Sequence, residues 1–166
     1  MLLRSQPYFT KVTETGERLI SWRVWVLIWV APVLFVLAGA GLLGEAGYRH
    51  VASTPTEGEV VRVYAWDGTT WFDSGKVNYS PVFRYIWSDG QPTEASSGMS
   101  HPDWNHEIGS RHPIRYFTGR KANIVIPGPQ NWYAGLIVGA IGLVLTVPAI
   151  VASLALWRWQ AKEKRE

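Results

Sequence analysis

Two long apolar blocks stand out along an otherwise mixed chain. Residues 24–44 and 134–157 contain no charged side chain. At about 1.5 Å of rise per residue, the first block would form a helix of roughly 31 Å, enough to cross a hydrocarbon core of about 30 Å. A helix on the surface of a soluble protein would carry a polar face, and neither block has one. The pattern therefore predicts two transmembrane helices, at residues 24–44 and 132–157.

The segment between the blocks has a different pattern, with short stretches in which apolar and polar residues alternate. This period of two is typical of β-strands. In the stretch 79–87 it places Phe83, Tyr85 and Trp87 on one face, which we expect to be the core face. Residues 54–58 have the composition of a linker. The expected strands are residues 59–66, 79–87, 91–97, 113–117 and 122–126.

The two patterns together predict a membrane protein of the α+β class. Two transmembrane helices would flank a small antiparallel β-domain of about five strands, arranged as a sandwich or half-barrel. The expected organisation is a cytoplasmic segment 1–23, a span 24–44, a β-domain 45–131, a span 132–157 and a basic tail 158–166.

The distribution of charge sets the expected orientation. The chain has a formal net charge of +3, and each terminal segment carries four basic residues against two acidic ones. Basic flanks favour the cytoplasmic side, so both termini should be cytoplasmic and residues 45–131 periplasmic or extracellular, in a bacterial inner membrane. Cleavage of the first block as a signal peptide is the alternative. We do not favour it, because the apolar run is longer than the roughly 7–15 residues of a signal sequence.

Composition and motifs argue against several kinds of chemistry. The absence of Cys excludes disulfides, Cys-ligated metals and a Cys nucleophile. The sequence contains no phosphate-binding loop, no dinucleotide fingerprint and no nucleophile elbow. Ser96, Ser97 and Ser100 lie near His101 and Asp103, but such local clustering is not how catalytic triads are built. We therefore expect no enzymatic activity, no cofactor and no nucleic-acid partner.

One polar loop, residues 100–112, could carry a metal site. Imidazole and carboxylate groups are good ligands for zinc, copper or nickel. The alternative is an ordinary polar loop facing solvent. The candidate ligands are His101, Asp103, His106 and His112, with Glu107 between them.

Two further sets of residues suggest contacts with lipid or with other helices. A basic cluster near the second span could meet phospholipid headgroups or an acidic partner, or could be a solvated strand–turn edge. Small residues spaced four apart in the spans allow helices to approach closely, although Gly and Ala are common in spans. The basic cluster is Arg111, Arg115, Arg120 and Lys121, and the small residues are Ala40, Gly44, Gly135 and Gly139.

Several short motifs occur in a fixed order between the two spans. They are Gly-Glu-Val-Val-Arg-Val at 58–63, Tyr-Ser-Pro-Val-Phe-Arg-Tyr at 79–85, Asp-Gly at 89–90, and Gly109 followed by Ile-Arg-Tyr at 114–116. This order resembles the bacterial family of unknown function numbered 3592, over residues 22–156. Ser110 stands where that family prefers Asp, and residues 117–120 replace its Asp-Pro-x-Asn-Pro segment. The resemblance implies two spans around an outer β-domain and no established activity.

From these observations we expect a non-enzymatic two-span membrane protein. Its extracytoplasmic β-domain would bind or brace a partner, as an accessory subunit of a larger membrane complex in contact with membrane lipid. The alternative function is ligand or metal sensing through the loop from His101 to His112.

Overall fold

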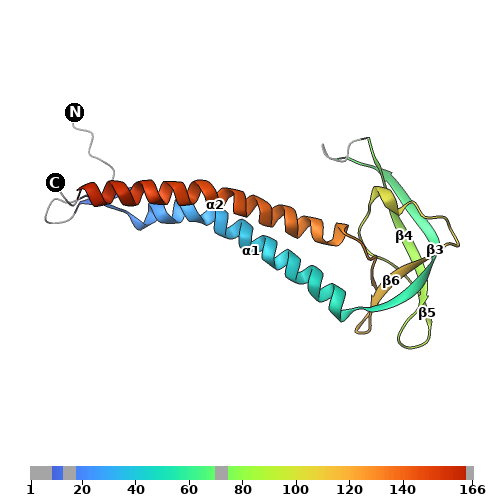
Figure 1. Ribbon diagram of the computed structural model, residues 1–166. Coiled ribbons are helices and arrows are strands. Elements are labelled where there is room, and N and C mark those ends of the chain that lie inside the picture. The colour runs from blue at the N-terminus through green and yellow to red at the C-terminus, as the bar shows by residue number, and fades with distance from the viewer. Residues whose placement is uncertain (1–8, 13–17, 70–74, 164–166) are drawn as a thin grey trace. The chain divides into compact units, whose positions relative to one another are not determined.

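The computed structural model of the protein describes residues 9–12, 18–69 and 75–163 (Figure 1). The described residues form two compact units, one within 46–131 and the other within 1–45 and 132–166. Their elements, in chain order, are β1 (Thr10–Val12), β2 (Arg18–Ile20), α1 (Trp22–Ala52), β3 (Thr54–Asp67), β4 (Val77–Ile86), β5 (Pro92–Ser96), the 3-10 helix η1 (Pro102–Trp104), β6 (Arg111–Phe117), β7 (Arg120–Val125) and α2 (Gln130–Glu163). The prediction of an α+β chain, with two long apolar helices flanking a five-stranded antiparallel sheet, is confirmed.

Both helices are long and apolar enough, by length and composition, to cross a membrane. Each is longer than the apolar block that predicted it: α1 has 31 residues and α2 has 34. The extra turns are polar or mixed, and the last turn of α1 contains Arg49 and His50. The apolar pattern marks the part of each helix that avoids water, whereas backbone hydrogen bonding continues beyond it.

In the unit formed by the chain ends, α1 and α2 pack against each other in antiparallel directions. A Cβ atom added to Gly39 would lie 2.6 Å from the Cα of Gly139, so the two backbones are in direct contact there. One turn further along α2, a Cβ on Gly142 would lie 2.6 Å from the backbone nitrogen of Val36. Further towards the start of α1, the Trp29 indole donates a hydrogen bond of 3.1 Å to the Ser153 hydroxyl. We call this contact line the glycine seam.

In the second unit, the five strands form one antiparallel sheet in the order β5-β4-β3-β6-β7. β3 is the longest strand, and it pairs with β6 through residues 54–59 and with β4 through residues 59–67. A register shift between Val60 and Arg62 marks a bulge. The terminal strands β5 and β7 also contact each other, so the sheet curls and nearly closes into a barrel. Bulges increase the local twist of a strand, which promotes this kind of closure.

The prediction that residues 54–58 form a linker is wrong, because these residues are the first part of β3. Pairing with β6 joins Thr54 to Tyr116 and Gly58 to His112. The Gly at position 58 is needed for close packing, since a Cβ there would lie 2.6 Å from Ile114 Cδ1 and 2.9 Å from Phe83 Cβ. A composition typical of turns is therefore overridden by pairing with a strand that lies far away in the sequence.

The core lies inside this curled sheet. The alternation on residues 79–87 has the expected consequence, because Phe83 is 0% exposed and Tyr85 3% exposed, while Trp87 packs at the edge of the core. Trp104, in η1, is also buried there. The buried cluster consists of Val60, Phe83, Tyr85, Ala95, Trp104, Ile114, Ile124 and Ile126.

Candidate functional site

The loop between β5 and β6, which was expected to be a polar segment, is attached to the sheet at several points. His101 and Tyr79 exchange backbone hydrogen bonds of 3.1 and 3.2 Å. The His101 side chain begins η1, because its Nδ1 accepts a hydrogen bond of 3.2 Å from the Asp103 backbone N–H. Trp104, the last residue of η1, is only 5% exposed. The loop therefore closes one part of the core instead of projecting into solvent.

The structure divides the four candidate metal ligands into two pairs. His101 Nδ1 lies 3.5 Å from Asp103 Oδ2, which makes one local pair. His106 and His112 make the other, with stacked rings whose centroids are 3.8 Å apart. Nowhere in residues 9–12, 18–69 and 75–163 do three His, Asp or Glu side chains come together in a way that could hold a metal ion. The four residues thus do not form a single ligand set.

The second pair forms a small half-buried cluster above Phe83. The ring centroids of His106 and His112 lie 6.3 and 6.4 Å from that of Phe83. Ser110 Oγ lies 2.9 Å from His112 Nε2. Burial lowers the pKa of His106, and the charge that His112 can carry lowers it further. The nitrogen lone pairs of an imidazole lie in the plane of its ring, so two stacked rings cannot both aim at a metal ion lying between them.

The backbone beside this cluster is also well ordered by hydrogen bonds. Gly109 has a φ of 89°, in the left-handed region that favours glycine. Its N–H donates to the Val60 carbonyl at 2.7 Å, and the Val60 N–H donates to the Ser110 carbonyl at 2.9 Å. Val60 is the residue before the bulge in β3, so the histidine cluster is tied to the centre of the sheet.

The basic cluster predicted to meet lipid or a partner is partly occupied by internal contacts. Arg115 Nε donates to Ser53 Oγ at 2.8 Å, and its Nη2 donates to the carbonyls of His50 and Ser53. These groups lie at the end of α1, where the last carbonyls of a helix lack partners within the helix. Arg115 therefore acts as a C-terminal cap for α1.

Lys121 is engaged in the same way. Its Nζ lies 2.8 Å from Asp89 Oδ2 and 5.1 Å from the centre of the Trp87 ring. Lys121 holds the pKa of Asp89 below its usual value. Arg111 and Arg120 are exposed, but they begin β6 and β7 respectively, with most of β6 between them. The four residues do not form one free basic patch.

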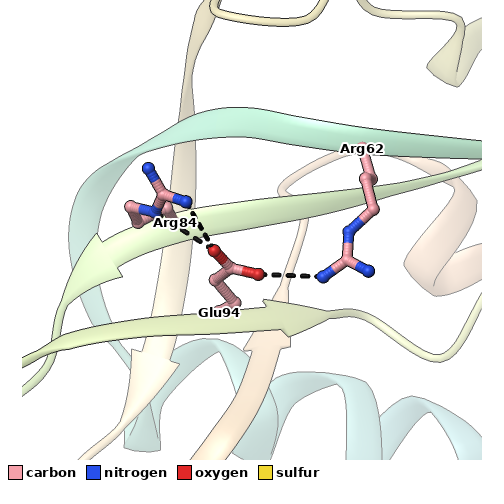
Figure 2. A network of polar contacts seen from close by, with 3 residues as sticks. All are labelled: Arg62, Arg84 and Glu94. Atoms are coloured by element: carbon pink, nitrogen blue, oxygen red, sulfur yellow. Dashed lines mark hydrogen bonds and ion pairs between the residues drawn. The ribbon is translucent and has the colours of Figure 1, made fainter.

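The outer face of the sheet carries a charged network that the sequence did not indicate. Figure 2 shows Glu94 on β5 between Arg62 on β3 and Arg84 on β4. The Glu94 carboxylate lies 3.0 Å from Arg62 Nη2 and 2.7 Å from Arg84 Nη2. Arg84, and then Arg62, lower the pKa of Glu94. Alternation in 79–87 placed Arg84 on the outer face, but its neighbours depend on strand pairing.

Exposed apolar side chains lie on the same face as this network. Tyr64 and Trp66 follow Arg62 at steps of two along β3, and they are 52% and 47% exposed. Ile86 follows Arg84 along β4 in the same way and is 57% exposed. We call this surface the outer face; its residues are Arg62, Tyr64, Trp66, Arg84, Ile86 and Glu94.

Of the four small residues predicted to pack helices, two lie in the contact between α1 and α2 and two do not. Gly135 and Gly139 lie in the glycine seam, where a Cβ on Gly135 would lie 2.7 Å from Leu43 Cγ. Ala40 is exposed, and a Cβ added to Gly44 would meet nothing within 4 Å among the described residues. The partner of Gly139 is Gly39, one residue before Ala40. One residue corresponds to a rotation of about 100° around a helix, so Gly39 and Ala40 face different directions.

The site residues thus fall into separate groups in the described part of the chain. The outer face presents exposed aromatic rings next to paired charges, and the histidine cluster is held within the fold. Comparison of the chain with protein-family models and with curated proteins gave no match.

Proposed function

We propose that this chain is a non-enzymatic, two-span membrane protein whose β-domain binds or braces a protein partner, as an accessory subunit of a larger membrane complex. The proposal that both helices span a membrane is carried by the exposure of apolar side chains around both of them. Leu27, Leu37, Leu143 and Val144 are each more than 60% exposed, while the seam holds mainly small residues. In water this surface would be unfavourable, whereas in lipid tails it is solvated.

The proposed orientation places both termini in the cytoplasm and residues 45–131 in the periplasm or outside the cell. It is supported by the basic residues that flank the spans, Arg23 and Arg158 among them. The absence of Cys makes this simple to test, because single cysteines can be added without background. Thr118→Cys in intact cells should react with a membrane-impermeant maleimide, and Ala161→Cys should react only after permeabilisation. The reverse labelling pattern would refute the orientation.

The outer face supports the proposed binding of a partner. Aromatic side chains and Arg are enriched where proteins bind each other, and here they lie on one side of the five-stranded sheet. The resemblance to the family of unknown function numbered 3592 rests on sequence motifs alone, stays a prediction and names no activity.

The direct test is a native pull-down of the full chain from mild detergent, followed by mass spectrometry. We expect one abundant membrane complex to copurify, and a Tyr64→Ala/Trp66→Ala variant to lose it. Ile108→Ala is the matched control, because Ile108 is 71% exposed but lies in the loop before β6. A protein that is always recovered alone, or a partner that both variants retain, would contradict the proposal.

The alternative is sensing of a metal ion by the loop from residue 101 to residue 112. It rests on the residue types, since the four side chains form two separate pairs. Titrating Zn²⁺ or Cu²⁺ into the full chain in detergent tests it through the unfolding midpoint. A saturable increase that His106→Ala abolishes would favour sensing, and an unchanged midpoint would end that alternative.

A further inference from the structure

The antiparallel helix contact brings the start of α1 and the end of α2 to the same end of their unit. Contacts join Gly39 to Gly139 and Trp29 to Ser153, so residue numbers rise along α1 as they fall along α2. Continuing this register places Trp22 within about one turn of Trp159. We call this the basic end of the helix pair.

Exposed indole rings gather at the basic end. Trp22 is 62% exposed, Trp157 68% and Trp159 38%. Indole rings combine a large apolar area with one N–H donor, and they prefer the boundary between headgroups and acyl chains. If the helices span a bilayer, these three rings lie at the depth of the headgroups.

Two exposed cations lie beside these rings. Arg158 and Lys162 are four residues apart on α2, so they share one face of the helix. Among the residues that the structure describes, neither side chain takes part in an ion pair or a hydrogen bond. Lys11 and Arg18, on β1 and β2 of the same unit, are exposed as well.

The sequence around the basic end also carries a net positive charge. The tail from 158 to 166 has four basic residues and two acidic ones, and the segment 1–23 has the same balance. By contrast, Arg115 and Lys121, which the sequence also suggested for lipid contact, are already bound to α1 carbonyls and to Asp89. At the basic end, Arg158 and Lys162 are exposed and positioned to meet a phosphate group.

We propose that Arg158, flanked by Trp157 and Trp159, and Lys162, one turn further along α2, bind the phosphate of anionic phospholipid headgroups in the cytoplasmic leaflet. A guanidinium matches two phosphate oxygens with parallel N–H groups, and an ammonium one turn away adds a second positive charge. The neighbouring indoles hold this end of the helix at the right depth. The inference rests on the proposed function, because it takes both helices to span the membrane.

The test measures which lipids the full chain retains. The protein is extracted in mild detergent with an equimolar mixture of phosphatidylglycerol and phosphatidylcholine, and bound lipids are counted by native mass spectrometry. We expect a preference for phosphatidylglycerol on the order of tenfold, consistent with two basic residues near an anionic surface. The Arg158→Gln/Lys162→Gln variant should lose this preference. Arg111→Gln/Arg120→Gln removes two exposed arginines from the β-domain and should keep it.

Three results would overturn the inference. They are an absence of preference in the unchanged chain, a preference that survives in the Arg158/Lys162 variant, and a preference lost only in the Arg111/Arg120 variant. Added inorganic phosphate separates a lipid site from a general anion site: we expect it not to displace phosphatidylglycerol, and complete displacement would refute a lipid site.

A flotation assay separates this inference from the proposed function. All three proteins should float with vesicles of phosphatidylcholine alone, because insertion depends on the apolar helices. A chain that fails to float refutes the membrane assignment itself. A chain that floats but shows no lipid preference refutes only the headgroup site.

Discussion

At the scale of single residues, Trp104 contributes much more to the β-domain than its polar neighbourhood indicates. It is the one member of the buried cluster that comes from η1, and it is 5% exposed. Trp104→Ala should lower the stability of the domain by about 3–5 kcal/mol, because a large cavity would form in the core. Hydrogen exchange of peptides from residues 46–131, measured on the full chain in detergent, gives this value.

Trp66→Ala is the matched control for Trp104. Trp66 is 47% exposed on the outer face, so its removal should change domain stability by less than about 1 kcal/mol. Equal losses in the two variants would mean that Trp104 does not hold the loop on the core.

We expect the histidine cluster to make the stability of the β-domain depend on pH. Burial, and then the charge of His112, lower the pKa of His106 from its ordinary value of 6.5. Above that value both the folded and unfolded forms are neutral, and stability is unaffected. As the pH falls below it, the unfolded chain binds a proton that the folded chain resists, so stability is lost until the lower folded pKa is passed.

The expected measurement is a fall in the unfolding midpoint as the pH decreases below about 6.5, beyond the fall caused by the carboxylates. His106→Phe should remove this component. His112→Gln should reduce it only in part, because burial remains the larger cause of the shift. A pH profile that is identical in all three proteins would show that the cluster does not resist protonation.

At the scale of elements, two glycines of α1 differ in whether an Ala substitution would disturb the packing of α1 against α2. A Cβ on Gly39 would collide with the backbone of Gly139, whereas a Cβ on Gly44 meets nothing among the described residues. Gly39→Ala should therefore separate the helices, and Gly44→Ala should be neutral or slightly stabilising through its higher helix propensity.

Crosslinking reports on this contact without other labels. Trp29→Cys and Ser153→Cys replace two residues that touch across the seam, in a chain that has no other Cys. A short bis-maleimide should join them in the presence of Gly44→Ala, and the yield should fall with Gly39→Ala. Equal yields would contradict the close approach at Gly39.

A second element-scale prediction concerns the cap at the end of α1. Arg115 reaches the carbonyls of His50 and Ser53 together with the Ser53 hydroxyl, a planar arrangement that Lys cannot reproduce. Arg115→Lys should cost about 1.5–3 kcal/mol, the usual range for hydrogen bonds to a charged group. Faster hydrogen exchange in residues 46–53 would show the loss, and Arg111→Lys, at an exposed position, should leave exchange there unchanged.

At the scale of the whole molecule, the unit within 46–131 has its own core and its own nearly closed sheet. The cap contacts of Arg115 lie entirely inside this unit. We therefore expect a fragment of residues 46–131 to fold alone in water and give a dispersed amide spectrum by nuclear magnetic resonance. A collapsed or aggregated fragment would show that the domain needs the helices to fold.

Many elements could be predicted because their signals are local. Apolar runs and short alternating stretches located both helices and the five strands of the larger sheet, since burial of one face imposes its period on the sequence. The short strands β1 and β2, within the segment 1–23, were not predicted. The pairing of residues 54–58 with β6 could not be predicted, because their partners lie more than fifty positions away. Trp104 was missed for a similar reason: nothing in the neighbouring residues shows that it turns into the core.

For the candidate sites, too, local sequence signals determined some features and contacts between distant residues determined the others. The sequence by itself determined which residue types could bind lipid, a partner or a metal, and that the chain is an α+β protein with two apolar helices. Only the tertiary structure decided that Arg115 and Lys121 are already bound, that the four candidate ligands form two pairs, and that Gly39 rather than Ala40 meets Gly139. The physical reason is that the alternation of buried and exposed positions can be read from neighbouring residues. Whether a side chain is free to bind a ligand depends on groups that folding brings to it from elsewhere in the chain.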